Sequence, residues 1–163
     1  MEKKFLNHNR ENRTIYAAPT KIDGEQRLKG KLLGKSYFHK ILLMFKALFF
    51  HSPYAVVILD REQRIVNISK NFTKIFQYKL SEVKGKYIHQ LVSLPEIKEQ
   101  IDNDIQSIYK GEIVKREGVR RRKDGRLMYV EIIGYPVTNR QSIIGAYMIF
   151  NDISEKKAYE EQL

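Results

Sequence analysis

The stretch RRKDGRLMYVEIIGYPV, residues 121–137, contains a strong turn signal at Asp124-Gly125. This dipeptide is typical of the tight turn of a β-hairpin when strand-like sequence lies on both sides of it. Strand-like sequence does flank it here, and a further apolar run follows after a polar gap. We therefore predict a hairpin and a third strand after it, with strands at about 112–122, 126–137 and 142–151.

The region upstream of these strands predicts two more strands and a block of short helices. The runs YAVVILD (54–60) and RIVNIS (64–69) are short and apolar, and the polar REQ between them resembles a turn. After them, apolar residues recur at helical spacing. The longest helical segment starts at Pro95 and ends before Gly111, residue types that favour helix ends. Its apolar stripe consists of Ile97, Ile101, Ile105 and Ile108.

This order of elements, with strands on both sides of a helical block, is typical of an α+β domain. We predict one five-stranded antiparallel sheet with short helices on one face, an N-terminal flanking helix and a C-terminal connector helix. A doubly wound parallel sheet is not expected, because strands and helices do not alternate. The predicted boundaries are 1–35 for a basic, flexible extension, 36–51 for the amphipathic flanking helix, 52–153 for the domain and 154–163 for the start of the C-terminal helix.

The predicted flanking helix is apolar on more than one side. Ser36 is expected to be its N-cap, and Pro53 follows its end. Because Leu43 and Met44 lie outside the main stripe, this helix favours a second partner besides its own domain. We predict that the partner is a second copy of the chain; contact with a membrane surface stays open and is not predicted. The main stripe, and predicted dimer contact, is formed by Phe38, Ile41, Leu42, Phe45, Leu48 and Phe49.

The composition limits the classes of protein that fit. The 163 residues carry a formal net charge of +11, and residues 1–40 hold ten Lys or Arg against four Asp or Glu. Such a basic extension can bind nucleic acid or anionic lipid, but a solvated tail is the favoured interpretation. The most apolar stretch, 37–50, is interrupted by His39, Lys40 and Lys46 and is too short to span a membrane. With no secretory leader at the start, we predict a cytoplasmic protein.

The sequence contains no recognisable constellation for catalysis or metal binding. The chain has no Cys, which excludes thiolate ligands and Cys nucleophiles. It has no phosphate-binding loop or dinucleotide fingerprint, and none of its four His is spaced to share a metal with another. We therefore expect no catalytic residues, no metal site and no enzyme activity within this chain.

Several short motifs follow one another from the first hairpin to the end of the last strand. They are Asp60, Tyr78, Glu82-Val83-Lys84-Gly85-Lys86, Lys123-Asp124-Gly125, Tyr135-Pro136-Val137 and Asp152-Ile153-Ser154. In this order they resemble a PAS domain of the bacterial S-box type, over about residues 43–163. Such domains are sensory modules of signal-transduction proteins such as histidine kinases and diguanylate cyclases. The chain departs from the family pattern at Ser69, where Asn is frequent, and at Gln77, where Gly is frequent.

The resemblance implies a domain that senses a ligand or a partner, and the residues narrow the choice of cofactor. A flavin–cysteinyl adduct and a coumarate chromophore both need a Cys, which is absent. Haem needs an axial ligand, usually a His on or near the long helix, and only His89 lies nearby, so haem is disfavoured too. An unidentified small molecule between the helices and the sheet remains open. The candidate lining residues are Ile101, Ile105, Tyr109, Tyr129 and Tyr147, with core packing as the competing interpretation.

The resemblance also implies a relay at the end of the last strand. Ser154 is expected to be the N-cap of the outgoing helix, and Asp152 to hold the junction through polar contacts to the sheet. The main hypothesis is a sensory and dimerisation module that forms a homodimer and regulates a kinase or cyclase output domain, in cis or in trans, in two-component signalling. One alternative is a stand-alone PAS interaction protein, and another is a nucleic-acid binder that uses its basic tail.

Overall fold

A computed structural model describes the backbone of residues 24–162 and the side chains of residues 30–162. The chain divides into two compact units, one that ends at Ile41 and one that begins at Leu42. A single helix, α1 (Gly24–Phe50), contains this boundary. Most of the predicted basic extension, residues 1–23, lies outside the described residues.

The helix α1 begins earlier than the sequence predicted. Ser36 lies inside the helix, so its assignment as the N-cap was wrong. The residues just before Ser36 are mostly good helix formers, and interior glycines such as Gly30 and Gly34 cost only about 1 kcal/mol each. Pro53 does follow the last turn, as expected. Among the described residues, no helix is long and apolar enough to cross a lipid bilayer.

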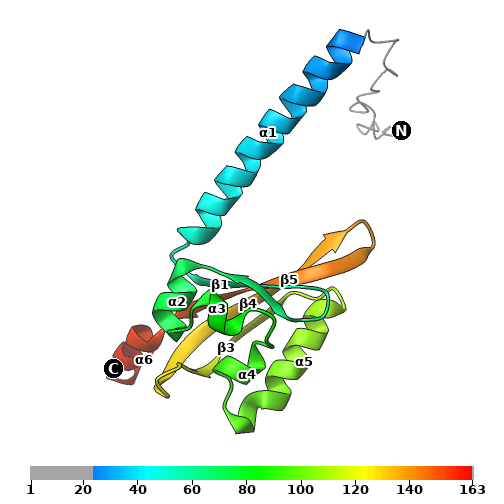
Figure 1. Cartoon of the computed structure of the whole chain (residues 1–163). Coiled ribbons are helices and arrows are strands. Elements are labelled where there is room, and N and C mark those ends of the chain that lie inside the picture. Colours follow the sequence, from blue (N-terminus) through cyan, green and yellow to red (C-terminus); the bar gives the residue numbers. More distant parts are fainter. Residues whose placement is uncertain (1–23, 163) are drawn as a thin grey trace, which may run out of the picture. The chain divides into compact units, whose positions relative to one another are not determined.

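The second unit is built on a five-stranded antiparallel sheet with the strand order β2-β1-β5-β4-β3 (Figure 1). The central strand β5 pairs with both β1 and β4, so the first hairpin lies beside the last strand. The β3–β4 turn contains Gly125 with φ of 85°, which confirms the turn expected from Asp124-Gly125. The strands are β1 (Ala55–Leu59), β2 (Ile65–Ile68), β3 (Val114–Arg121), β4 (Leu127–Asn139) and β5 (Ser142–Asp152).

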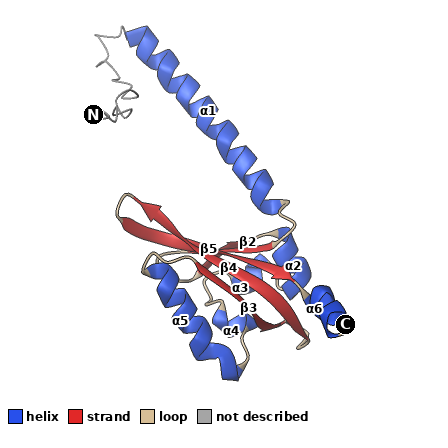
Figure 2. Cartoon of the chain, turned by 180° about the vertical axis from the view of Figure 1, so that it is seen from behind, coloured by secondary structure: helices blue, strands red, loops and turns tan. Residues whose placement is uncertain are grey.

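The helices between β2 and β3 gather on one face of the sheet, which confirms the predicted α+β layout (Figure 2). Pro95 begins a short 3-10 turn that leads into the longest of them, and Gly111 follows the end of that helix with φ of 98°. A further helix follows β5. The helices of this unit are α2 (Lys70–Phe76), α3 (Leu80–Val83), α4 (His89–Val92), α5 (Lys98–Tyr109) and α6 (Ser154–Glu161).

The core lies between this helical layer and the inner face of the sheet. Because strand residues alternate between faces, Met148 and Phe150 of β5 point toward the helices and are buried. The rings of Phe72 and Phe76 on α2 meet the Phe150 ring edge-on, with centroids 6.2 and 5.2 Å away. Opposite α5, β4 carries Gly134, where a Cβ would overlap Cδ1 of Ile108. The close approach of α5 to the sheet therefore requires glycine at this position.

Candidate functional site

The predicted ligand-lining residues of α5 do face the sheet. Ile101 and Ile105 are buried, and they belong to one core cluster together with Ile108. Tyr109 is half-buried, and its hydroxyl donates a hydrogen bond to the carbonyl of Asp60 at the end of β1. Burial raises the pKa of Tyr109, and the nearby acidic side chains add to this rise. Tyr109 therefore links α5 to the β1–β2 turn as a neutral phenol.

The two strand tyrosines lie on the opposite face of the sheet from these isoleucines. On β4, Tyr129 is 44% exposed, whereas its neighbours Met128 and Val130 are buried against the helices. On β5, Tyr147 stacks on Tyr135 with ring centroids 5.0 Å apart and an interplanar angle of 20°. The structure thus does not bring the tyrosines and the isoleucines together. Residue type alone does not reveal this separation, because alternate positions of a strand point to opposite faces of the sheet.

The exit from β5 into α6 is held to the sheet by polar contacts. The carboxylate of Asp152 accepts the backbone N–H of Ser154 at 2.9 Å, and the hydroxyl of Ser154 accepts the backbone N–H of Tyr129 on β4 at 3.1 Å. The N–H of Ile153 also donates to the carbonyl of Tyr129, at 2.9 Å. The backbone N–H and the carbonyl of Tyr129 are therefore both bonded to the residues that start α6.

These contacts differ from the roles that the sequence predicted for Asp152 and Ser154. Ser154 is the first residue of α6, and the N-cap position belongs to Ile153, so the expectation that Ser154 caps the helix was wrong. Its hydroxyl contacts β4 instead, while Asp152 contacts Ser154. The contact to the neighbouring strand thus comes from Ser154 and not from Asp152. A hydroxyl can bond either to its own helix or to an adjacent strand, and sequence alone does not decide between the two.

An ion pair ties the first turn of α6 to the edge strand. The ammonium of Lys157 lies 2.8 Å from a carboxylate oxygen of Glu117 on β3. This hydrogen bond lowers the pKa of Glu117 and raises that of Lys157. A shallow groove lies beside the contact, between α6 and the ends of β3 and β4, with Val119, Leu127 and Ala158 among its lining residues. The connector helix is thus bonded to two strands of the sheet.

Ser69 holds the start of the helical layer and was not singled out as a site by the sequence analysis. It is fully buried at the N-cap of α2, and its hydroxyl accepts the N–H groups of Phe72 at 3.2 Å and Val56 at 2.9 Å. The same hydroxyl donates to the carbonyl of Tyr54 at 3.2 Å. A serine thus satisfies both the helix and the first strand at a position where the family often has Asn.

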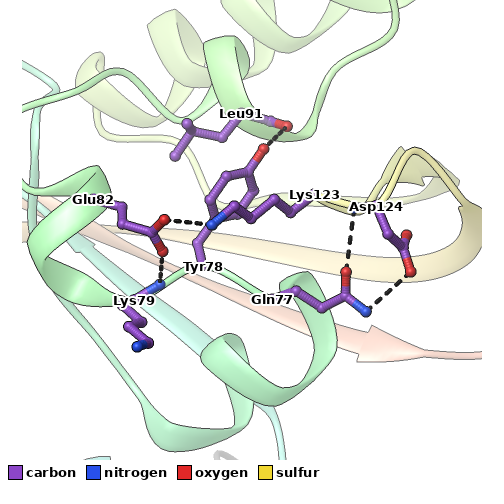
Figure 3. A network of polar contacts seen from close by, with 7 residues as sticks. All are labelled: Gln77, Tyr78, Lys79, Glu82, Leu91, Lys123 and Asp124. Atoms are coloured by element: carbon purple, nitrogen blue, oxygen red, sulfur yellow. Dashed lines mark hydrogen bonds and ion pairs between the residues drawn. The ribbon is translucent and has the colours of Figure 1, made fainter.

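Gln77, the second departure from the family pattern, adopts the left-handed conformation with φ of 66°. Its side chain donates to the carboxylate of Asp124 at 3.0 Å and accepts the backbone N–H of Asp124 at 3.2 Å (Figure 3). Glycine would adopt this conformation at lower cost. The two hydrogen bonds to the β3–β4 turn offset part of that cost and link α2 to the turn.

A second tie joins α3 to the same β3–β4 turn. Glu82 pairs with the ammonium of Lys123 and also accepts the backbone N–H of Lys79 at 2.8 Å (Figure 3). These contacts, the one with Lys123 first, lower the pKa of Glu82. The Lys123 ammonium lies 5.7 Å from the centroid of the Tyr78 ring, and the Tyr78 hydroxyl donates to the carbonyl of Leu91 at 3.3 Å. The motif residues of the helical block and the hairpin therefore form one polar network.

The fold thus brings motif residues that are far apart in the sequence into contact. Comparison with known proteins identifies this fold. Residues 53–155 match a family model described as PAS domain. The chain belongs to the PAS domain family. The predicted resemblance is confirmed, and this PAS domain is by family a sensory domain. No curated protein matches the chain.

Solved structures of other PAS domains share the fold. The PAS domain of a protein from Colwellia psychrerythraea is 21% identical, with a TM-score of 0.64 over 71% of this chain and 98% of that chain. That of an HTR-like protein from Haloarcula marismortui is 26% identical, with a TM-score of 0.58 over 78% and 99%. That of a LuxR-family transcriptional regulator from Burkholderia thailandensis, in complex with ethanol, is 18% identical, with a TM-score of 0.56 over 68% and 97%. These likenesses confirm the predicted architecture of the PAS domain.

Proposed function

We propose that this PAS domain is the sensory and dimerisation module of a cytoplasmic signalling protein and relays its state through α6 to an output domain of the two-component type. The observation that carries the proposal is the bonding of α6 to two strands, through Ser154 to Tyr129 of β4 and through Lys157 to Glu117 of β3. The kinase or cyclase activity belongs, in this proposal, to the output domain, in cis or in trans.

The junction can convert a change in the sheet into a movement of the helix. The backbone N–H of Tyr129 donates to the hydroxyl of Ser154, and its carbonyl accepts the N–H of Ile153. A change in the twist of β4 relative to β5 therefore displaces the two residues that start α6. Asp152 fixes the direction of this first turn, because its carboxylate accepts the N–H of Ser154. A ligand or partner that alters the sheet would thus bias the direction of α6.

Replacement of the junction hydroxyl tests this relay. In Ser154→Ala, one hydrogen bond between α6 and β4 is lost, so amide exchange in residues 155–161 should accelerate by about fivefold, the equivalent of roughly 1 kcal/mol. Exchange in the centre of β4 and β5 should not change. Ser142→Ala, at an exposed position on β5, is the matched control. Unchanged exchange in α6 would show that this contact does not hold the helix.

The role of Asp152 needs a functional measurement. A fusion of the full chain to a kinase output domain should lose its dependence on the signal when Asp152 is replaced by Ala, because the first turn of α6 is then no longer fixed to the strand end. Glu99→Ala, at an exposed position in α5, serves as a control for a lost surface carboxylate. If the Asp152 variant kept normal regulation, the proposed part of Asp152 in the relay would be rejected.

The dimerisation part of the proposal rests on α1. Its predicted stripe contains large side chains that are exposed within the described chain, such as Phe38, Phe45 and Leu48. A helix that leaves such side chains in water gains stability from a second copy of itself. Sedimentation velocity should therefore show a dimer that Phe45→Glu converts to a monomer. His39→Glu places the same acid outside the stripe and should leave the dimer intact.

A further inference from the structure

The edge strand β3 carries two arginines and a glycine on the face that points toward the helices. Arg116, Gly118 and Arg120 alternate with Lys115, Glu117 and Val119, as the two faces of a strand require. Their partners on β4 are Ile132, Val130 and Met128, respectively. All three partners are buried in the core, so this face of β3 is the inner one.

Arg120 is a buried cation with little compensation. It is 3% exposed, and among the described residues its guanidinium makes one hydrogen bond, from Nη1 to the carbonyl of Val119 at 2.8 Å. None of the ion pairs within residues 30–162 includes it. Burial lowers the pKa of Arg120 to about 10. A buried charge of this kind is costly unless an anion or a full set of hydrogen bonds accompanies it.

The nearest carboxylate is already engaged by the other arginine. Asp104 on α5 accepts hydrogen bonds from Nε and Nη2 of Arg116, each at 2.8 Å, in the two-point geometry that guanidinium and carboxylate groups favour. Asp104 acts on Arg120 only through its charge. The inner face of β3 therefore presents two guanidinium groups to one carboxylate and keeps one excess positive charge.

Gly118 lies between the two arginines, and the guanidinium of Arg120 lies against it. A Cβ built at Gly118 would lie 3.3 Å from Nη1 of Arg120, and no other heavy atom outside the adjacent residues lies within 4 Å of it. Four residues of extended strand separate the Cα atoms of Arg116 and Arg120 by about 13 Å, so the two guanidinium groups approach Gly118 from opposite ends. The conformation of Gly118 does not itself require glycine, because its φ is not positive. The guanidinium of Arg120 thus lies against Gly118, and among the described residues only its Nη1 makes a hydrogen bond.

We propose that Arg120, with Gly118 and Arg116, binds the carboxylate of a small organic acid on the inner face of β3. The inference rests on the proposed sensory function and names the chemical class of its ligand. A carboxylate fits because the planar guanidinium fork binds two oxygen atoms at once, as Arg116 does with Asp104. The apolar residues beside the site on β4, Val130 and Met128, suit the hydrocarbon part of such an acid.

Calorimetric titration of the full chain tests the proposal with acetate, butyrate and octanoate, each beside its uncharged amide and at constant ionic strength. At least one acid should bind, and its amide should not. Arg120→Met should weaken binding at least tenfold, about 1.4 kcal/mol. The variant is expected to fold, because an apolar replacement of a buried charge is often neutral or stabilising. Gly118→Ala should weaken binding as well, while Arg121→Met removes the same charge from the opposite face and should not.

The carboxylate site would be overturned if no acid binds to the wild-type chain, if an amide binds as well as its acid, or if Arg120→Met binds as tightly as the wild type. Binding of inorganic phosphate without binding of any carboxylate would also overturn it. The relay is judged separately, because amide exchange in α6 and sedimentation of the α1 variants need no ligand. A failed titration with an intact relay would therefore reject the ligand class and keep the proposed function.

Discussion

The two faces of the one sheet differ in what covers them. On the inner face, Met148 and Phe150 are buried beneath α2 to α5. On the outer face of the same strand, Tyr147 is only half-buried and packs mainly against Tyr135. The residues on the two faces come from the same strands. Stability in this domain is therefore concentrated on one side of the sheet, whereas the other side and the strand ends remain accessible.

Truncation of an inner ring should have the largest effect. Phe150→Ala removes a ring that contacts Phe72 and Phe76, so it should lower the free energy of unfolding by about 3–5 kcal/mol. Tyr147→Ala, three residues earlier on the outer face, should cost less than about 1.5 kcal/mol, because the ring loses mainly one aromatic contact. Urea denaturation measures both. Equal losses would mean that the outer face is as important for stability as the core.

The buried hydroxyl that anchors the helical layer comes next in size. Ser69→Ala removes the cap of α2 and leaves the N–H of Val56 without its partner, so it should cost about 2–3 kcal/mol. Ser81→Ala, at an exposed position in α3, is the control and should stay within about 0.5 kcal/mol of the wild type. Thermal and urea unfolding would both show the difference. A loss below 0.5 kcal/mol for Ser69→Ala would contradict the role of its hydroxyl.

At the rim of the inner side, the left-handed residue Gln77 separates backbone strain from hydrogen bonding. Gln77→Ala keeps the strained φ and loses both hydrogen bonds to Asp124, so it should cost about 1 kcal/mol. Gln77→Gly loses the same bonds but relieves the strain, so it should be more stable than the Ala variant by roughly 1 kcal/mol. Parallel urea titrations compare the two. Identical stabilities would show that the left-handed conformation carries no cost here.

The smallest expected effect is a pH dependence at the β3–β4 turn. Hydrogen bonds, first of all from the backbone N–H of Arg126, lower the pKa of Asp124 from its ordinary value of 3.8 to about 2. The ionised carboxylate therefore stabilises the folded state above pH 3.8, and this contribution is lost as the pH falls toward 2. Asp124→Asn should be less stable than the wild type at neutral pH, and the difference should shrink on acidification. A difference that is constant with pH would reject this assignment.

Much of the fold could be predicted from the sequence. The Asp124-Gly125 turn, the five strand-like runs and the isoleucine stripe of α5 all depend on local residue order, and all are present in the structure. The start of α1 was missed because Ser36 is a good cap by type, while the helix formers before it continue the helix. Local preferences compete there, and the longer run of helix formers wins.

The candidate site was harder to predict. The sequence marked Asp152 and Ser154 as the junction, but it reversed their contacts, because each polar group can bond locally or across to another strand. It grouped Tyr129 and Tyr147 with Ile101 and Ile105, which lie on the other side of the sheet. It gave no role to Arg120, which alternation along β3 buries on the inner face. Alternation along each strand assigns every position to one face of the sheet. This pattern could have separated the tyrosines from the isoleucines and placed Arg120 on the inner face.

By itself, the sequence determined the class of the fold, the order of its elements and the absence of cysteine chemistry, because these follow from local spacing and from residue types. Only the tertiary structure decided which partner each polar group takes. Ser69 bonds to Tyr54 and Val56, and Ser154 bonds to Tyr129, across distances in sequence that no local pattern encodes. The physical reason is that a buried donor or acceptor must be satisfied by whatever group the packing of the chain brings beside it.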